Sequence, residues 1–186
     1  MGNNALIKAV TDVDLPFEIT EPSVLNEIIA KKPSVVSERQ LVSSEEILIS
    51  YKFANCQAIA LLGNRIGALA HNVSGDNPQN SLTGERTNKE ERREDPRIIF
   101  PNRNNTLAFH IYLINNYQWS EQIINEALKQ IRINHIYHLP IKSRVENHPT
   151  LRNVALDVPQ RKLYIFPIDF DYGICLPIDK IVRPNT

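Results

Sequence analysis

An apolar segment with a turn signal near its centre, residues 56–71, restricts the fold of this chain more than any other part of the sequence. It reads CQAIALLGNRIGALAH, and the pair Gly63-Asn64 supplies the positive φ angles that a tight hairpin turn needs. The apolar runs on both sides of this pair have the length of strands. The segment therefore predicts a β-hairpin that turns at Gly63-Asn64.

The register of this hairpin decides whether two reactive side chains meet. With a loop of those two residues, Leu62 pairs with Arg65, and Cys56 lies directly opposite His71. Paired residues share a face of the sheet with Cβ atoms about 5 Å apart, whereas a three-residue loop would put His71 on the other face. A thiol and an imidazole at that separation can exchange a proton, which is the minimum requirement of a cysteine nucleophile.

The composition narrows the classes of partner that we expect. With 186 residues, of which 42% are hydrophobic, the chain is long enough for one domain with a sizeable core. Its 21 basic and 21 acidic residues cancel, so no net field favours nucleic acid or an anionic membrane. No apolar run reaches the roughly 18 residues of a transmembrane helix, and the N-terminus lacks the pattern of a signal peptide. We therefore expect a cytoplasmic monomer that binds neither nucleic acid nor membrane.

The remaining cysteine and histidines indicate no second site. Two cysteines, Cys56 and Cys175, cannot build a disulfide framework and favour a reducing compartment. Cys175 has no histidine near it in the sequence, so we predict a structural role. The pair His135 and His138 is too closely spaced to define a zinc site by itself, and on a strand the two rings would point to opposite faces. Phosphate-binding and dinucleotide-binding glycine motifs are absent from the sequence. We expect neither a metal nor a cofactor.

Hydrophobic periodicity predicts a few helices among many strands. The clearest helix begins at Ser120, with Glu121 in its first turn, where the helix dipole favours negative charge. Its apolar residues recur at helical spacing as far as Ile131. We also predict a short helix after Pro22, strands at 47–53, 107–114, 132–139, 152–158 and 161–168, and an irregular tail from Asp169. The fold class is α+β, with β-sandwich-like mixed sheets flanked by helices.

We expect residues 1–186 to form a single domain with two additions, an N-terminal extension at 1–45 and a polar loop insertion at 72–105. The insertion is too polar to be buried and too long for an ordinary connection. It is either a solvated segment or a flap that recognises substrate. Its position directly after His71 slightly favours the flap. Its basic residues are matched by acidic ones, which argues against a nucleic-acid patch.

The residues around the hairpin resemble a known family. Residues 50–62, SYKFANCQAIALL, and residues 66–71, IGALAH, resemble the active-site region of the CheD chemoreceptor deamidases, which have a Gly-Ser-Cys-Val-Ala-like run and then a Gly-Gly-Leu-Ala-His-like run. The spacing from Cys56 to His71 is similar to that in the catalytic domain of cytotoxic necrotizing factor and in Burkholderia lethal factor. Residues 152–165 resemble the last CheD hairpin more loosely. These relatives are protein glutamine deamidases built on a β-sandwich flanked by helices.

The resemblance implies a role for three residues. Cys56 corresponds to the nucleophile, His71 to the general base, and Ser50 to a threonine that orients the histidine in CheD proteins. The pair Ala54-Asn55 departs from the Gly-Ser or Ser-Gly that usually precedes the cysteine, beside the backbone expected to hold the oxyanion.

The activity implied is that of a hydrolase without a cofactor, which converts a glutamine of a target protein to glutamate with release of ammonia. The partner would be a chemoreceptor or a host regulatory protein. In the second case the chain would be a bacterial toxin or effector delivered into the host cytosol without a classical signal peptide.

Two alternatives stay open at this point. A transglutaminase would use the same thiol chemistry to transfer the acyl group to an amine. A catalytically inert interaction module would keep the fold with Cys56 buried, because free cysteine is among the most buried residues. A papain-like protease fits less well, since its histidine lies far downstream of its cysteine.

Overall fold

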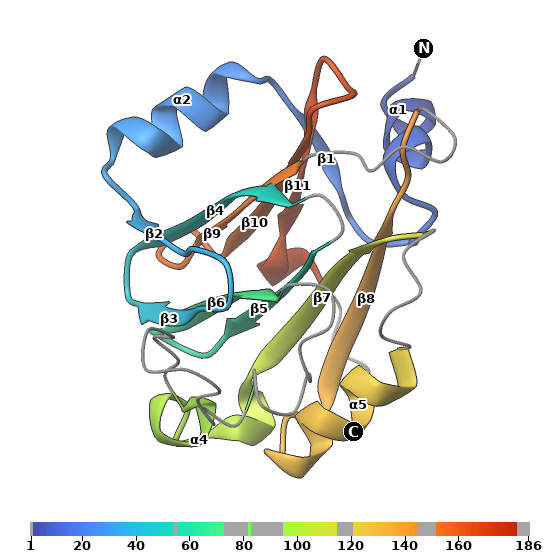
Figure 1. The fold of residues 1–186 in the computed structure, drawn as a ribbon. Helices are drawn as coiled ribbons and strands as arrows, with labels where there is room; N and C mark the ends of the chain where they lie inside the picture. The colour runs from blue at the N-terminus through green and yellow to red at the C-terminus, as the bar shows by residue number, and fades with distance from the viewer. Residues whose placement is uncertain are drawn as a thin grey trace.

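Two mixed β-sheets form the framework of the protein and enclose one hydrophobic core between them (Figure 1). The computed structural model describes residues 2–53, 56–72, 82, 95–114, 121–144 and 152–181. The first sheet has six strands, which in spatial order are β1 (Glu18–Thr20), β11 (Gly173–Pro177), β10 (Lys162–Pro167), β9 (Arg152–Asp157), β4 (Ile47–Phe53) and β2 (Ser34–Val35). The second has five strands, β3 (Leu41–Ser44), β6 (Gly67–Asn72), β5 (Gln57–Leu62), β7 (Leu107–Leu113) and β8 (His135–Ile141). Neighbouring strands are antiparallel, except that β2 runs parallel to β4 and β7 parallel to β8.

Helices cover the outer faces of both sheets. The helical segments are α1 (Asn3–Val10), α2 (Ser23–Ala30), α4 (Pro96–Ile99), α5 (Glu121–Gln130) and the single 3-10 turns η1 (Arg103–Asn105) and η2 (Ile178–Lys180). The apolar side of α2 packs on the first sheet through Ile28, and that of α5 packs on the second through Ile124 and Leu128. In Figure 1, α2 lies above the first sheet and α5 below the second, with the two sheets between them.

The central hairpin is apolar on both faces because both faces are buried. Side chains of β5 alternate between the inner core, reached by Ala58 and Leu62, and the outer core under α5, reached by Ile59 and Leu61. A strand covered on both sides reads as a continuous apolar run rather than an alternating one. This explains the apolar composition of residues 56–71.

The hairpin is present, but the predicted loop and register are wrong. Leu62 pairs with Gly67, and Gly63 N–H donates to Ile66 O at 2.9 Å, so the loop is Asn64-Arg65. Neither of these loop residues, nor Gly63, has a positive φ.

Gly63 lies close to a bulky side chain and outside the two-residue loop. A Cβ atom at Gly63 would lie 3.1 Å from the ring of Phe100. In the register that pairs Leu62 with Gly67, His71 pairs with Ala58 and not with Cys56.

Most of the predicted elements are confirmed. The structure has the short helix after Pro22, the helix from Glu121 and strands at all the predicted places, although β8 begins at His135 rather than at 132. Ser120 lies outside the described residues. The prediction of an irregular tail is wrong, because Gly173–Pro177 forms β11, which pairs with both β1 and β10. Its short apolar run is buried on both faces and therefore shows no alternation.

The structure describes the two predicted additions to different extents. The segment expected to be an N-terminal extension contributes β1 and β2 to one sheet and β3 to the other. Of the expected insertion, 73–81 and 83–94 lie outside the described residues. Within its described part, Leu82 is buried in the outer core of the second sheet, and residues 96–99 form α4. Among the described helices, none has the length and apolar character needed to cross a membrane.

Candidate active site

Cys56 and His71 lie at the same end of the central hairpin and face the core between the sheets. Cys56 directly precedes β5 and is 9% exposed, and His71 on β6 is 2% exposed. The register differs from the predicted one by two residues, and side chains alternate with a period of two. His71, opposite Ala58, therefore keeps the same face as Cys56.

An irregularity in β4 brings two further side chains against His71. The pairing of β4 with β9 shifts by one residue between Ser50 and Phe53, and Lys52 has a φ of 58°. This is a β-bulge, which adds one residue to one strand and re-aims the side chains after it. Without the extra residue, Ser50 and Phe53 would point to opposite faces. With it, Ser50 bonds His71, and the Phe53 ring stacks on the imidazole at 3.9 Å between centroids.

A chain of hydrogen bonds sets the tautomer of His71. Ser50 Oγ lies 2.5 Å from the carbonyl oxygen of Val36 and 2.9 Å from His71 Nδ1. Since the hydroxyl has a single proton and donates it to Val36 O, Ser50 Oγ must accept a proton from Nδ1. The neutral ring then carries its lone pair on Nε2. This atom is buried and has no hydrogen-bond partner among the described residues. A basic nitrogen is therefore available beside the thiol.

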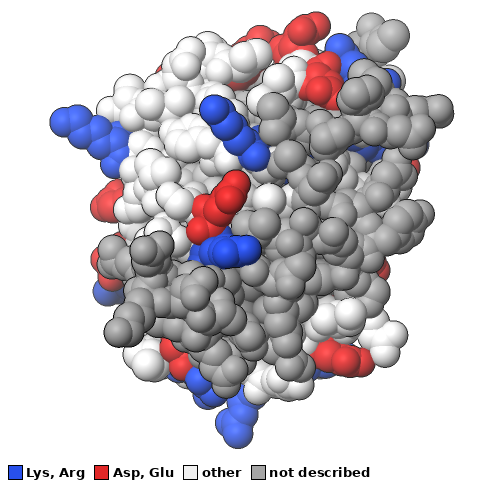
Figure 2. All heavy atoms as spheres, in the orientation of Figure 1, with Lys and Arg blue, Asp and Glu red and all other residues white. Residues whose placement is uncertain are grey.

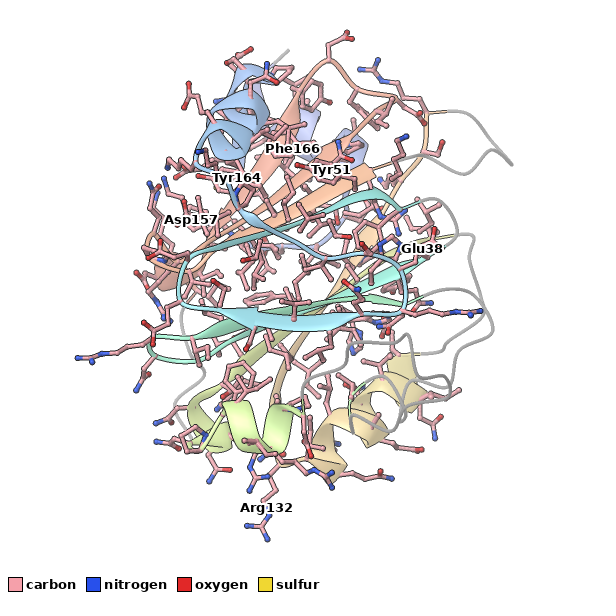
Figure 3. All side chains as sticks on the ribbon, turned by 60° about the vertical axis from the view of Figure 1, so that its left-hand side comes forward. Glu38, Tyr51, Arg132, Asp157, Tyr164 and Phe166 are labelled. Carbon is pink, nitrogen blue, oxygen red and sulfur yellow. The ribbon has the colours of Figure 1, made fainter. Side chains whose placement is uncertain are left out.

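The turn between β2 and β3 holds His71 by its main chain. Arg39 N–H donates to His71 O at 2.8 Å, and His71 N–H donates to Gln40 O at 3.0 Å. The same turn carries Glu38, which is exposed. One ligand atom each of Glu38, Cys56 and His71 lie within 4.8 Å of one another. Figure 3 shows Glu38 near one end of the sheets, while Asp157 lies at the other end.

A buried guanidinium lies behind the cysteine. Arg152 at the start of β9 is fully buried, and its Nη2 donates to the main-chain oxygen of Cys56 at 2.7 Å. Burial lowers the pKa of Arg152 to about 10, and attraction to the charged form of Cys56 opposes this shift. The guanidinium thus remains charged near neutral pH and favours a thiolate at Cys56.

The environment of His71 keeps its imidazole neutral. Burial, and secondly the positive charge of Arg152, lower the pKa of His71 to about 4. At neutral pH the ring can accept a proton but does not carry one in the resting state. This is the protonation state that a general base requires.

Behind the site, on the outer face of the second sheet, polar side chains form a second chain. Gln57 Oε1 lies 2.7 Å from His110 Nε2, His110 Nδ1 lies 3.0 Å from His138 Nδ1, and His138 Nε2 lies 3.0 Å from Asn125 Oδ1. His138 therefore pairs with His110 and not with His135. The chain links the residue after Cys56 to α5.

The other cysteine has a different environment. Cys175, in the middle of β11, is 4% exposed and packs under α2 with Tyr164 and Phe166. Burial raises its pKa to about 11, a shift that nearby Lys162 opposes. This environment fits the predicted structural role.

Features elsewhere on the surface offer less chemistry. A pocket of about 420 Å³ lies at the loop end of the hairpin, opposite to Cys56, and is lined by residues such as Ile66 and Phe100 but by no cysteine or histidine. On the face in Figure 2, the charged side chains of the described residues are scattered, with both signs interspersed. Neither feature competes with the Cys56 site as a reactive centre.

The structure therefore brings together all three residues that the sequence singled out. Ser50, Cys56 and His71 meet at one end of the core, and Ala54-Asn55 lie outside the described residues. Sequence reasoning missed Glu38 and Arg152. Arg152 had a signal, because it shares the inward-facing parity of Val154 and Leu156, where a charge is unexpected. Glu38 had none, since only the long-range pairing of β3 with β6 brings its turn to His71.

Comparison with models of known protein families and with curated protein sequences finds no match to this chain.

Proposed function

We propose that this protein is a cysteine-dependent protein glutamine deamidase with a fold like that of CheD and cytotoxic necrotizing factor. Cys56 acts as nucleophile, His71 as general base and Ser50 as the residue that orients His71. One observation carries the proposal: the Ser50 hydrogen bond leaves the lone pair of a neutral, buried imidazole on Nε2, and a nitrogen of this ring lies within 4.8 Å of the Cys56 sulfur. The resemblance of residues 50–71 to the CheD active-site region supports the choice of substrate.

The first half of the reaction forms a thioester. His71 Nε2 accepts the thiol proton of Cys56, and the thiolate attacks the carboxamide carbon of a glutamine side chain. The main-chain N–H of Cys56 donates to the oxyanion. Protonated His71 then gives its proton to the departing nitrogen, and ammonia leaves.

The second half restores the enzyme. His71 removes a proton from water, the hydroxide attacks the thioester carbon, and the thiol leaves with the proton returned by His71. The product is glutamate, and no cofactor takes part. An amine in place of water would give a transglutaminase product from the same thioester.

The substrate class is a folded protein. A bacterial chemoreceptor and a eukaryotic regulatory protein are the two sources that the resemblance implies, the second with delivery of the chain as an effector into a host cytosol. The site lies at the end of the sheets, where β6 leads into the segment that follows Asn72. The polar segment predicted at 72–105 would then contribute to target recognition.

The direct test is deamidation in heavy-oxygen water. Wild-type protein and the variant Cys56→Ala are incubated with purified chemoreceptor cytoplasmic domains and, separately, with a dialysed eukaryotic cytosolic extract. We expect glutamate residues carrying heavy oxygen at former glutamine positions with wild type only, together with ammonia release. Equal deamidation by Cys56→Ala would refute the role of Cys56 as nucleophile, and no deamidation by either protein would favour the inert interaction module.

The role of Ser50 has its own test. Removing the hydroxyl in Ser50→Ala frees Nδ1 and leaves Val36 O without its donor, so we expect a loss of about 1 kcal/mol, or roughly fivefold, in deamidation rate. Ser50→Thr keeps the hydroxyl and should recover most of the rate. If Ser50→Ala and Ser50→Thr are equally slow, the loss reflects packing at this buried position and not the hydrogen bond.

A further inference from the structure

Three polar side chains at the end of the hairpin are of the residue types that bind zinc. Glu38, Cys56 and His71 offer a carboxylate, a thiolate and an imidazole, whose ligand atoms lie within 4.8 Å of one another. Among the described residues, no other group of three histidine, cysteine or acidic side chains comes together in this way. The bonds to one tetrahedral Zn²⁺ are about 2.0–2.3 Å long, so the three ligand atoms would have to move closer together. Glu38 is exposed on a turn, so its side chain has the freedom to make that adjustment.

His71 is already arranged as a metal ligand. A histidine that binds a metal through one nitrogen usually donates its other N–H to an oxygen, which fixes the ring and the tautomer. Here Nδ1–H donates to Ser50 Oγ, which in turn donates to Val36 O. The buried Nε2 has no hydrogen-bond partner among the described residues. An unpartnered buried nitrogen costs free energy that a bound cation would recover.

The number and charge of the ligands define the kind of site. Three protein ligands leave the fourth tetrahedral position to water, as in open zinc sites. Two negative ligands, the Cys56 thiolate and the Glu38 carboxylate, balance the charge of the ion, but the buried guanidinium of Arg152 behind Cys56 repels it. This repulsion weakens the site relative to structural zinc sites with four ligands. Binding is therefore expected to be reversible.

We propose that Glu38, Cys56 and His71 bind Zn²⁺ reversibly, and that the bound ion blocks the Cys56 thiol. Binding replaces the thiol proton by a Zn–S bond and releases that proton to solvent, with no change of oxidation state. The bound ion is coordinated by both the nucleophilic sulfur of Cys56 and the basic Nε2 of His71. Any reaction of Cys56, with a substrate or with a simple alkylating agent, then stops.

The proposal is independent of the proposed function, because it needs only the three ligands. The experiment uses the full chain, which is reduced with a phosphine because a thiol reductant would itself bind zinc. Zn²⁺ binding is measured by titration calorimetry, and Co²⁺ substitution is followed by the sulfur-to-cobalt charge-transfer absorption. Labelling of Cys56 and Cys175 by iodoacetamide is measured with and without Zn²⁺.

Two variants and two matched controls complete the test. Glu38→Gln removes one ligand with little change of shape, and Cys56→Ser removes the thiolate. Glu45→Gln changes another exposed glutamate at the far end of the hairpin, and Cys175→Ser removes the other thiol.

We expect one Zn²⁺ per chain, a cobalt–thiolate band, and protection of Cys56 but not Cys175 that a chelator reverses. Glu38→Gln should weaken binding about tenfold or more, Cys56→Ser should abolish the cobalt–thiolate band, and the two controls should match wild type.

Three results would overturn the proposal. They are an unchanged zinc affinity in Glu38→Gln, a cobalt–thiolate band that survives in Cys56→Ser, or unprotected Cys56 at saturating zinc. None of these readouts involves a glutamine substrate. A protein that binds zinc in this way but deamidates nothing would refute the proposed function alone, and one that deamidates but binds no zinc would refute the zinc site alone.

Discussion

The two cysteines are almost equally buried, with exposures of 9% for Cys56 and 4% for Cys175, and yet their surroundings are opposite in character. Cys56 directly precedes β5 and lies beside a neutral imidazole and a buried guanidinium. Cys175 lies within a strand among aromatic rings, near Glu18 and Asp157, which raise its pKa further. Burial alone therefore does not distinguish a reactive thiol from a structural one.

The difference lies in which form of the sulfur each environment stabilises. A positive charge and a nearby proton acceptor favour the thiolate, whereas burial without a cation favours the thiol. At Cys56 the cation is supplied by Arg152 and the acceptor by His71. At Cys175 the pKa is raised to about 11, so the thiol persists. The contrast can be tested on each side.

The largest expected effect is the difference in alkylation rate. With a pKa of about 11, Cys175 is thiolate to about one part in ten thousand at pH 7. We expect iodoacetamide to label Cys56 more than about a hundredfold faster than Cys175. Mass spectrometry of tryptic peptides over a time course measures both rates in one sample, and the variants Cys56→Ala and Cys175→Ala confirm the assignment. Slow labelling at similar rates at both sites would contradict the proposal that Cys56 is a reactive thiol.

Replacing Arg152 should remove most of this contrast. Arg152→Met keeps an unbranched side chain of related shape, but it loses the charge and the 2.7 Å hydrogen bond to Cys56 O. A nearby opposite charge shifts a pKa by about 1–3 units, so loss of the Arg152 charge should slow labelling of Cys56 by about tenfold or more. Labelling of Cys175 should not change.

A matched arginine provides the control for this variant. Arg161 donates to Gly63 O at 3.0 Å. Gly63 directly follows β5, whereas Cys56 directly precedes it. Arg161→Met should leave labelling of Cys56 within a factor of about two, given the distance between the sites. If both arginine variants slow the labelling of Cys56 equally, the slower labelling is due to a general loss of stability and not to the charge of Arg152.

The sequence allowed the faces of the central hairpin to be predicted, although not its register. An error of two residues in pairing leaves every side chain on its predicted face, so Cys56 and His71 still share the inner side. The loop is Asn64-Arg65 rather than Gly63-Asn64, and Gly63 lies where an added Cβ atom would come within 3.1 Å of the Phe100 ring. That close approach joins residues far apart in sequence, and local turn rules cannot see it.

The parts of the site that could not be predicted depend on the same long-range contacts. Ser50 is predicted through resemblance alone, and the side of the strand on which Phe53 lies depends on a bulge at Lys52. Glu38 reaches the site on a turn that is fixed by hydrogen bonds to His71. Strand β11 was missed because burial on both faces removes the alternation that marks a strand. Periodicity predicts elements, but the site is made by their packing.

The pH dependence of stability should carry the signature of Cys175. Its pKa is about 11 in the folded protein and 9.0 as the reference value, so between these values the unfolded chain has lost a proton that the folded chain retains. Stability therefore falls as pH rises from about 9 to 11, by about 1–2 kcal/mol from this group. Urea unfolding at pH 8, 9 and 10 should show a smaller decline for Cys175→Ala than for wild type. Parallel declines would mean that burial does not hold this thiol protonated.

The smallest expected effect concerns the bulge that aims Ser50 and Phe53 at His71. Lys52 has a φ of 58°, a conformation that asparagine tolerates and a β-branched residue strongly resists. Lys52→Val should therefore lower the free energy of unfolding by about 1 kcal/mol and slow the alkylation of Cys56, because relaxing the bulge turns Phe53 away from the imidazole.

Lys52→Asn removes the same charge but keeps the backbone conformation, so both its stability and its Cys56 labelling should stay close to wild type. Urea unfolding and peptide mass spectrometry on the two variants separate backbone from charge. If valine and asparagine behave alike, the positive φ of Lys52 is not what positions the site. The reactivity of Cys56 would then depend on Arg152 and His71 without help from the bulge.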